Sequence, residues 1–153
     1  MYTSLVTRPD ITFGVVTLSQ FLDNPEDAHW EAVKHILHYL SSTKTLALTY
    51  GEEHYDLLGY TDTDGAMQEH RHAISGYTFL IDGGAVFWSS QKQELVMLST
   101  AEAEYVTATH AAKEALWLWR LIHKLFPSLA RPIMLYCNNQ STLKLIEDDN
   151  YQA

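Results

Sequence analysis

The sequence predicts an α/β domain whose elements follow the order βββαβα, preceded by a helical hairpin. The spacing of apolar residues changes along the chain and supports this prediction. Residues 1–50 place apolar side chains at helical spacing, whereas residues 57–93 contain three short runs rich in aromatic and β-branched residues. A long amphipathic segment, an apolar run and a second amphipathic segment follow, which favours a mixed sheet with helices packed on it.

The composition indicates a folded protein of modest size. The chain has 153 residues, of which 46% are hydrophobic, and this argues against disorder and for a compact domain with its own core. The single cysteine, Cys137, excludes an intrachain disulfide and offers no pair for structural zinc. The formal net charge of -9 has the wrong sign for binding that depends on phosphate neutralisation. A role on nucleic acid would therefore need metal ions, local basic patches or neighbouring domains.

The chain shows no signal for membrane insertion or export. No apolar run reaches about 18 residues, the length at which a membrane helix becomes a candidate. The first ten residues lack the basic and then apolar pattern of a signal peptide. We expect an intracellular protein, cytoplasmic or nuclear, with no membrane partner.

Two helices are predicted in the first third of the chain. Asp10 is the expected N-cap of the first helix, because apolar residues follow it at helical spacing from Ile11 to Leu22. Asn24 is the expected cap of the second, with Pro25 at the first helical position, where its missing N–H does no harm. Together the two segments predict a helical hairpin.

Three antiparallel strands are predicted next, over residues 57–66, 75–82 and 85–93. Each run is short, and turn-forming residues separate it from its neighbours. The sequence DGGA, which begins at Asp82, lies between the second and third strands and is typical of a tight hairpin turn. These strands would form the antiparallel half of the sheet.

The longest helix is predicted after Ser99 and is closed by Pro127. Residues 131–138 then form a nearly continuous apolar run, as expected for a strand buried in a sheet. A last helix begins at Asn139. The long helix is expected to bury an apolar face made by Tyr105, Ala108, Ala112, Ala115, Trp119, Ile122 and Phe126.

Acidic residues gather where the first strand ends and the long helix begins. Asp62 and Asp64 follow the first apolar run, and Glu102 and Glu104 open the helix. Carboxylates from separate elements that meet in one place can hold divalent cations for phosphoryl chemistry, because such ions prefer hard oxygen ligands. Turns and first helical turns also favour acidic residues for structural reasons, so spacing alone leaves both interpretations open.

The two glutamates differ in their expected roles. Ser99 and Glu102 have the spacing of a capping box, in which the glutamate side chain reaches back to the helix start, so Glu102 has a structural role. Glu104 shares a helix face with small residues that allow close packing on a sheet, and it is the better functional candidate. Asp62 and Asp64 point to the same side of an extended strand, and either could reach a metal.

Several motifs in combination resemble those of one known family. The string STAEAEY follows a strand that contains WSS, and AAKEALWL follows STAEAEY in turn. With GYTDTDGA before them and LYCNNQST after them, these strings resemble the ribonuclease H domain of copia-type LTR retrotransposon Pol polyproteins. Residues 53–153 resemble that domain, and residues 1–52 resemble the helical segment that joins it to the end of the reverse transcriptase.

The resemblance implies a ribonuclease H-like fold that cleaves the RNA strand of an RNA/DNA hybrid with two Mg²⁺ ions, or with Mn²⁺. It places the carboxylate of the first strand at Asp62, with Asp64 as second choice, and the helical carboxylate at Glu104. It also implies two partners, an RNA/DNA hybrid and the reverse transcriptase portion of the same polyprotein.

The sequence departs from the family pattern in two places. Family members read LYCDNQS where this chain reads LYCNNQS, so Asn138 stands at the position of a third carboxylate. An amide brings no negative charge, so metal affinity and hydrolysis should fall, the latter by about a hundredfold or more. The family continues with a stretch that resembles HARTKHID and a last strand and helix. This sequence has Gln152 in place of the histidine and ends at DDNYQA, so we expect a truncated domain without the final aspartate.

Two functions remain open on the sequence. The first is a ribonuclease H-like domain whose ancestral activity is impaired or lost in this chain. The alternative is a non-catalytic remnant or domesticated module that keeps the fold and binds nucleic acid or protein. Asn138 and the expected loss of the last elements both favour impaired catalysis.

Overall fold

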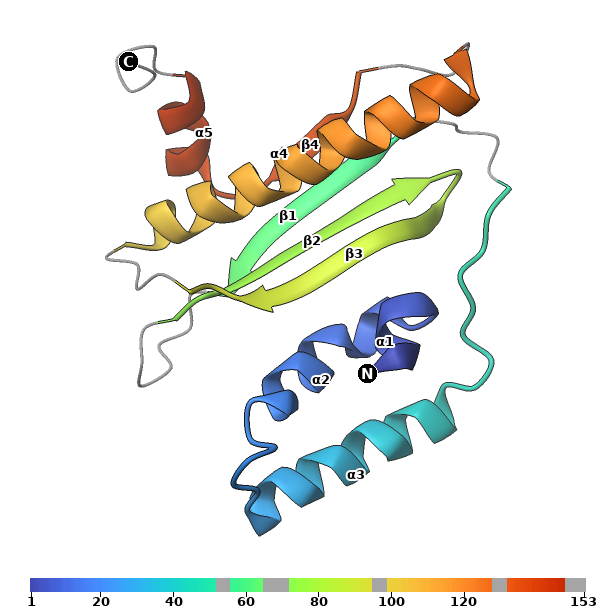
Figure 1. Ribbon diagram of the computed structural model, residues 1–153, viewed down its shortest axis with the longest axis vertical. Coiled ribbons are helices and arrows are strands. Elements are labelled where there is room, and N and C mark those ends of the chain that lie inside the picture. The colour runs from blue at the N-terminus through green and yellow to red at the C-terminus, as the bar shows by residue number, and fades with distance from the viewer. Residues whose placement is uncertain (52–55, 65–71, 95–98, 128–131, 148–153) are drawn as a thin grey trace. The chain divides into compact units, whose positions relative to one another are not determined.

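In the computed structural model, the described residues are 1–51, 56–64, 72–94, 99–127 and 132–147. They divide into two compact units, Met1–Thr49 and Tyr50–Ala153, which Figure 1 draws from blue at the N-terminus to red at the C-terminus. Gln152, where the family has a histidine, lies outside the described residues. Within the described ranges, no helix is both long and apolar enough to cross a bilayer.

The first unit is helical and contains a packed pair of helices. Gly14 in the first helix of the pair lies against Ile36 in the second, and a Cβ at Gly14 would come within 3.2 Å of the Ile36 Cδ1 atom. This close approach confirms the predicted helical hairpin. The helices are α1 (Tyr2–Val6), the 3-10 helix η1 (Pro9–Ile11), α2 (Thr12–Ser19) and α3 (Asp27–Ser42).

Both N-caps predicted for this hairpin are wrong. Asp10 lies inside η1, and its carboxylate accepts hydrogen bonds from the Arg8 guanidinium, with 2.7 Å between Arg8 Nη2 and Asp10 Oδ2. Glu26, not Asn24, caps α3. The Glu26 side chain accepts from the backbone of His29, and the His29 Nδ1 atom accepts from the Glu26 N–H at 3.0 Å. The prediction missed this capping box because it relied on the usual cap residue types.

The second unit is a four-stranded mixed sheet with two helices, and it carries all the candidate site residues. Its strand order is β3-β2-β1-β4. The first three strands are antiparallel, whereas β4 pairs parallel with β1. The elements are β1 (Leu58–Asp64), β2 (Ile74–Ile81), β3 (Gly84–Lys92), α4 (Thr100–Leu125), β4 (Met134–Cys137) and α5 (Gln140–Glu147).

This topology follows from the connections between the elements. Asp82 and Gly83 join β2 to β3, and both have positive φ angles, 54° and 81°, as a two-residue hairpin turn requires. The predicted hairpin is therefore confirmed. Next, α4 carries the chain from one edge of the sheet to the other and packs on β1 and β2 on the way (Figure 1). The βββαβα order and mixed sheet confirm the ribonuclease H-like fold class expected from the sequence.

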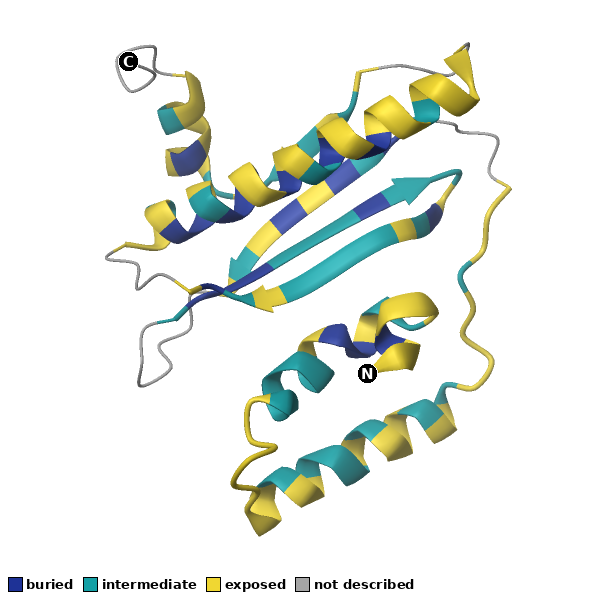
Figure 2. Cartoon of the chain, viewed as in Figure 1, coloured by how far each residue is buried: buried dark blue, intermediate teal, exposed yellow. Residues whose placement is uncertain are grey.

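The face of α4 toward the sheet consists mainly of small residues, and Figure 2 shows this face as a buried line along the helix. Tyr105, Ala112, Trp119 and Phe126, which were predicted to be buried, are exposed, so the predicted face was rotated from the true one. Small side chains let the helix backbone approach the sheet, which bulky aromatic side chains would prevent. The buried residues of α4 are Ala103, Glu104, Thr107, Ala108, Ala111, Ala115 and Leu118.

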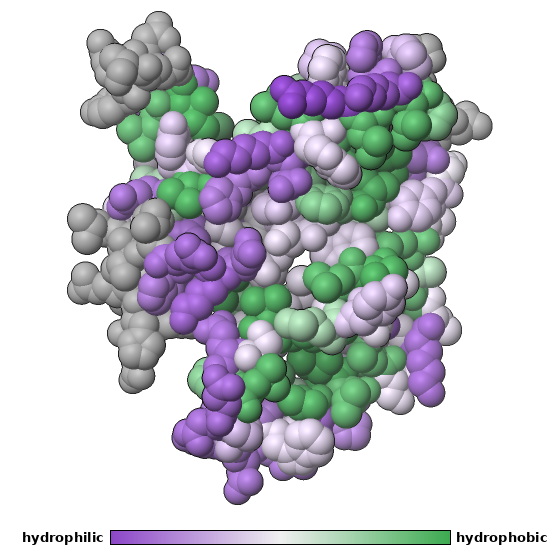
Figure 3. Space-filling view, viewed as in Figure 1, coloured by the Kyte–Doolittle hydropathy of each residue, from purple (hydrophilic) through white to green (hydrophobic). Residues whose placement is uncertain are grey.

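The outward surface around the C-terminal half of α4 carries apolar side chains, interrupted by hydrophilic ones (Figure 3). Leu116, Trp117 and Leu125 are all more than half exposed, at 57%, 53% and 61%. The helix therefore has a buried face of small residues and an exposed surface that carries large apolar ones.

Candidate active site

Asp62 lies near the end of β1, on the side of the strand that α4 does not cover. Exposure alternates along this strand: Tyr60, Asp62 and Asp64 are exposed, whereas Thr61 is buried and Thr63 is half-buried. The Thr63 hydroxyl contacts α4 through Thr107, so the exposed set must point away from that helix. The two aspartates therefore share one side of the strand, as the sequence predicted.

Asn138 lies next to Asp62 because β4, which precedes Asn138, pairs parallel with β1, which contains Asp62. Thr61 in β1 pairs with Cys137 in β4, so the next residue of each strand emerges at the same edge of the sheet. The Asn138 Nδ2 atom donates a hydrogen bond to the Asp62 Oδ1 atom at 3.2 Å. Both side chains are exposed. The amide thus touches the carboxylate that the sequence analysis preferred as first metal ligand.

The residue after Asn138 holds the start of α5 in place. Asn139 Oδ1 accepts hydrogen bonds from the backbone N–H groups of Ser141 and Thr142, each at 3.0 Å. The Thr142 hydroxyl then donates to the Ala101 carbonyl oxygen at 3.2 Å. This contact ties α5 to the first turn of α4, so the segment that carries Asn138 is anchored on both sides.

Glu104 is a buried carboxylate in the second turn of α4, with an exposed fraction of 6%. Burial raises its pKa, hydrogen bonding to Thr63 lowers it, and the negative charge of Asp62 raises it further. The net effect is a pKa above the ordinary value. The Glu104 Oε2 atom is buried and has no hydrogen-bond partner. A buried carboxylate oxygen with no partner is costly, so this atom is the feature of the site that most needs a ligand.

The N-cap of the long helix is the predicted residue, which confirms one of the two bonds of the predicted capping box. Ser99 precedes α4, and its hydroxyl accepts a hydrogen bond from the Glu102 backbone N–H at 3.2 Å. Glu102 itself is exposed, in contrast to Glu104 two residues later. The functional preference for Glu104 over Glu102 therefore agrees with the burial of the two side chains.

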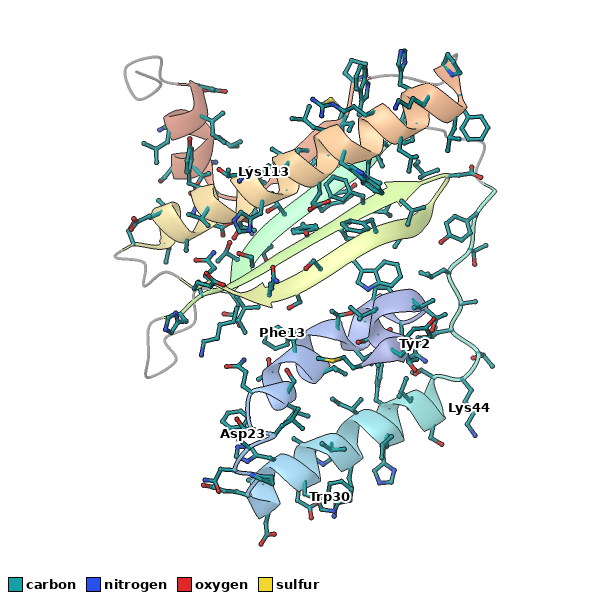
Figure 4. All side chains as sticks on the ribbon, in the orientation of Figure 1. Tyr2, Phe13, Asp23, Trp30, Lys44 and Lys113 are labelled. Atoms are coloured by element: carbon teal, nitrogen blue, oxygen red, sulfur yellow. The ribbon has the colours of Figure 1, made fainter. Side chains whose placement is uncertain are left out.

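A buried hydrogen-bond network of hydroxyl and amide groups holds the turn of α4 that carries Glu104 against the sheet. The Thr107 hydroxyl lies 2.5 Å from that of Thr63 and 2.7 Å from that of Ser75. The Gln93 amide nitrogen donates to Ser75 Oγ at 2.8 Å, to the Ala103 carbonyl at 3.0 Å and to Thr107 Oγ1 at 3.1 Å. These bonds join β1, β2 and the end of β3 to the turn of α4 that carries Glu104. Figure 4 shows side chains filling the space between α4 and the sheet.

Sequence reasoning missed this network. Thr107 follows Glu104 by three residues and lies on the same helix face, which is a signal that the sequence did contain. Ser75 and Gln93 gave no comparable signal, because their roles depend on the register between β2 and β3 and on the packing of α4.

Asp62 and Asn138 are in contact, and Glu104 lies in the turn of α4 that contacts Thr63, the residue after Asp62. Together these three side chains offer only oxygen ligands for a metal ion. Asp62 and Glu104 bring carboxylates, and the Asn138 amide has an oxygen that a rotation would present. Such hard donors suit Mg²⁺ or Mn²⁺. Among the described residues, no group of three or more His, Cys, Asp or Glu side chains could hold a metal ion, and at residue 138 the side chain is an amide. The bond to Asn138 and the charge that acts on Glu104 both belong to Asp62 rather than to Asp64.

Comparison with curated proteins finds polyproteins of mobile elements. The retrovirus-related Pol polyprotein from transposon TNT 1-94 of Nicotiana tabacum is 43% identical over 154 residues, which cover 100% of this chain and 12% of that protein. The retrovirus-related Pol polyprotein from transposon RE2 of Arabidopsis thaliana is 35% identical over 136 residues, which cover 87% of this chain and 9% of that protein. The chain therefore corresponds to a small part of these polyproteins. No protein-family model matches it.

Two further matches are proteins that are not named as Pol polyproteins. The secreted RxLR effector protein 161 of Plasmopara viticola is 45% identical over 120 residues, which cover 77% of this chain and 84% of that protein. Among solved structures, the catalytic domain of human endonuclease V is 12% identical and aligns over 72% of this chain and 48% of that chain. Its TM-score of 0.28 is too low to bear on fold or function.

Proposed function

Since this chain belongs to the copia-type Pol polyproteins of LTR retrotransposons, we propose that residues 53–153 are a ribonuclease H-like nuclease domain. Its substrate is the RNA strand of an RNA/DNA hybrid, and its activity depends on Mg²⁺ or Mn²⁺. Residues 1–52 are the helical connection from the reverse transcriptase of the same polyprotein, which is also the domain's natural partner. In this chain, catalysis is impaired at Asn138.

One observation supports the proposal above the others: the Asn138 amide and the Asp62 carboxylate are 3.2 Å apart, at the ends of adjacent parallel strands. Ligands of α/β sheets bind outside the carboxyl ends of parallel strands. Glu104 lies in the turn of α4 that Thr63, the residue after Asp62, contacts through Thr107 and the Ala103 carbonyl oxygen. Two strands and a helix therefore bring their polar side chains to one edge of the sheet.

Each residue has a defined part in the proposed reaction. The exposed Asp62 and the buried Glu104 are the anionic ligands that hold a divalent cation. A cation bound there would stabilise the negative charge that develops on the phosphate oxygens. The network through Thr107 keeps the Glu104 turn at a fixed distance from β1, so the two carboxylates need little rearrangement to act together.

Asn138 reduces the electrostatic strength of the site. An aspartate at this position would bring a third negative charge next to Asp62, whereas the amide brings none. Removal of one preorganised electrostatic group costs about a hundredfold or more in rate. We therefore expect slow hydrolysis by the chain with Asn138 and faster hydrolysis once a carboxylate is restored.

The test is cleavage of a labelled RNA/DNA hybrid in Mg²⁺ and then in Mn²⁺ by the wild-type chain and its Asn138→Asp variant. We expect Asn138→Asp to cleave about a hundredfold faster. Asp62→Asn in the Asn138→Asp background is the matched control, because it removes one carboxylate from an exposed position and should abolish the gain. A folded Asn138→Asp protein that does not cleave would contradict the proposal.

A second candidate function is a binding module without catalysis. Two observations favour it: the amide at residue 138, and the likeness to a protein whose name describes a secreted effector rather than a polyprotein. This candidate predicts that neither the wild type nor Asn138→Asp cleaves the hybrid. It also predicts binding that hardly changes with salt concentration, because a net charge of -9 leaves few phosphate contacts to be screened. Titration of the hybrid at two salt concentrations would show this.

A further inference from the structure

We infer that the site formed by Asp62, Glu104 and Asn138 takes one divalent cation rather than two, and that the Asn138 amide turns over to become a ligand of that cation. The inference deepens the proposed function, on which it rests for the nature of the ion. It concerns ion number and amide orientation, which can be measured without any nucleic acid.

The charge of the donor set favours a single ion. Asp62 and Glu104 supply two negative charges, which neutralise one divalent cation, and Asn138 supplies none. A second ion within the reach of the same oxygens would meet the first one without a counter-charge. Like charges at short range repel strongly, and more so beside a buried group where water screens little. The three side chains assigned to the site therefore match the charge of one ion.

The burial of Glu104 points to a ligand at this place. Its side chain is only 6% exposed, and its Oε2 atom lacks a hydrogen-bond partner. Thr63 provides hydrogen bonding to the carboxylate, yet this leaves the second oxygen unsatisfied. A cation between Glu104 and Asp62 would satisfy that oxygen and would also remove the repulsion between the two carboxylates.

The Asn138 amide directs its N–H group at Asp62, where a bound cation would lie. Its Nδ2 hydrogen atoms face the Asp62 Oδ1 atom, which accepts one of them at 3.2 Å. A cation drawn to Asp62 would meet these hydrogen atoms and be repelled. Rotation of the amide by half a turn about the Cβ–Cγ bond exchanges its nitrogen for its oxygen, and this torsion is soft in asparagine. Because Asn138 is exposed, the packing around it permits the rotation.

The number of ions is tested by titration of the intact chain with Mn²⁺, with the free ion measured by electron paramagnetic resonance. We expect one Mn²⁺ per wild-type chain and no specific binding to Asp62→Asn. Asn138→Asp should bind more tightly, on the order of tenfold, because it adds a charged ligand. Asp64→Asn is the matched control, since it removes a carboxylate from the same exposed side of β1, and it should bind as the wild type does. Two ions per wild-type chain would overturn the inference.

The orientation of the amide is tested by nuclear magnetic resonance on protein labelled with ¹⁵N-asparagine. The Asn138 side-chain signal is assigned by its loss in Asn138→Asp, and Mg²⁺ is then added. We expect this signal to shift and to saturate with the same affinity as the bound ion. The signal of Asn139, whose oxygen caps α5, should move less and serves as an internal control. An Asn138 signal that does not respond while the ion binds would refute the ligand role.

These outcomes are distinct from failure of the proposed function. If one ion binds and the amide responds, yet Asn138→Asp cleaves no hybrid, the ion site stands and the nuclease proposal falls. If Asn138→Asp cleaves but the wild-type chain binds two ions, the nuclease proposal stands and this inference falls.

Discussion

The interface between α4 and the sheet has two halves of opposite chemistry. In the half toward the C-terminus of the helix, Phe79 is fully buried against small residues such as Ala111, and Leu118 closes the cluster. In the half toward the N-terminus, the buried groups are polar, with Thr107 at the centre of a hydrogen-bonded network and Glu104 beside it. The apolar half stabilises the fold, whereas the polar half holds the turn of the proposed ligand Glu104, whose buried carboxylate lowers stability.

The largest expected effect comes from the apolar half. Phe79→Ala removes a fully buried ring that packs in the cluster with Leu57 and Leu118. We expect the free energy of unfolding to fall by about 3 to 5 kcal/mol, measured by urea denaturation. Val86→Ala, at an exposed position of β3, is the control and should cost far less. A loss of similar size at both positions would show that Phe79 is not the centre of the core.

A smaller effect is expected from the polar half. Thr107→Val keeps the shape of the side chain but removes the hydroxyl that joins Thr63, Ser75 and Gln93. Their buried polar atoms would lose a partner, which costs about 1 to 3 kcal/mol of stability. Cation affinity should fall as well, because the turn that carries Glu104 is no longer held to β1. Both quantities are measured on the same sample, by urea denaturation and by Mn²⁺ titration.

Thr109→Val is the matched control for this prediction. Thr109 is exposed, and its hydroxyl donates only within the helix, to the Tyr105 carbonyl at 2.9 Å. It should change stability by a few tenths of a kcal/mol and leave cation affinity unchanged. Equal effects at Thr107 and Thr109 would mean that the network does not position the site.

The two halves also differ in how much space they leave for an added methyl group at a glycine of the sheet. Gly59 lies in β1 on the apolar side, where a Cβ would come within 2.6 Å of the Phe79 Cε1 atom and 2.8 Å of the Leu135 Cδ1 atom. Gly59→Ala should therefore destabilise the fold by about 1 to 3 kcal/mol. Gly76, in β2 opposite Asp62, has more room: the nearest atom would be the Asp62 carbonyl oxygen at 3.6 Å. Gly76→Ala should therefore cost less in the same denaturation experiment.

The sequence predicted much of the fold because its strongest signals are local. The alternation in β1, the turn at Asp82 and the cap at Ser99 each depend on a few neighbouring residues, and the structure has all three. The helix caps at Asp10 and Asn24 failed because competing local contacts, an ion pair and a different capping box, were stronger than residue preference.

Prediction of the site had a different limit. Glu104 was separated from Glu102 by a capping argument, and the structure gives the two residues different burial. The contact between Asp62 and Asn138 depends on the parallel register of β1 and β4, which no local pattern specifies; only the resemblance suggested it. The network around Thr107 joins four separate segments, so it became visible only once their packing was known.

The smallest expected effect is the pH dependence of the free energy of unfolding that Glu104 causes in the polar half. Burial, and then the charge of Asp62, raise the pKa of Glu104 in the folded protein, while in the unfolded chain it has its ordinary value. Between these two values the folded state holds a proton that the unfolded state releases, so the free energy of unfolding falls as pH rises.

The Glu104→Gln variant has an amide that carries no negative charge at any of these pH values. In metal-free buffer it should therefore be more stable than the wild type at neutral pH, with a difference that shrinks as pH falls through that window. Glu102→Gln removes the same charge at an exposed position in the first turn of α4. It should melt like the wild type, because glutamine fits the same position of a capping box. A Glu104→Gln protein less stable than the wild type at neutral pH would mean that the carboxylate stabilises this half of the interface, and the contrast between the two halves would then fail.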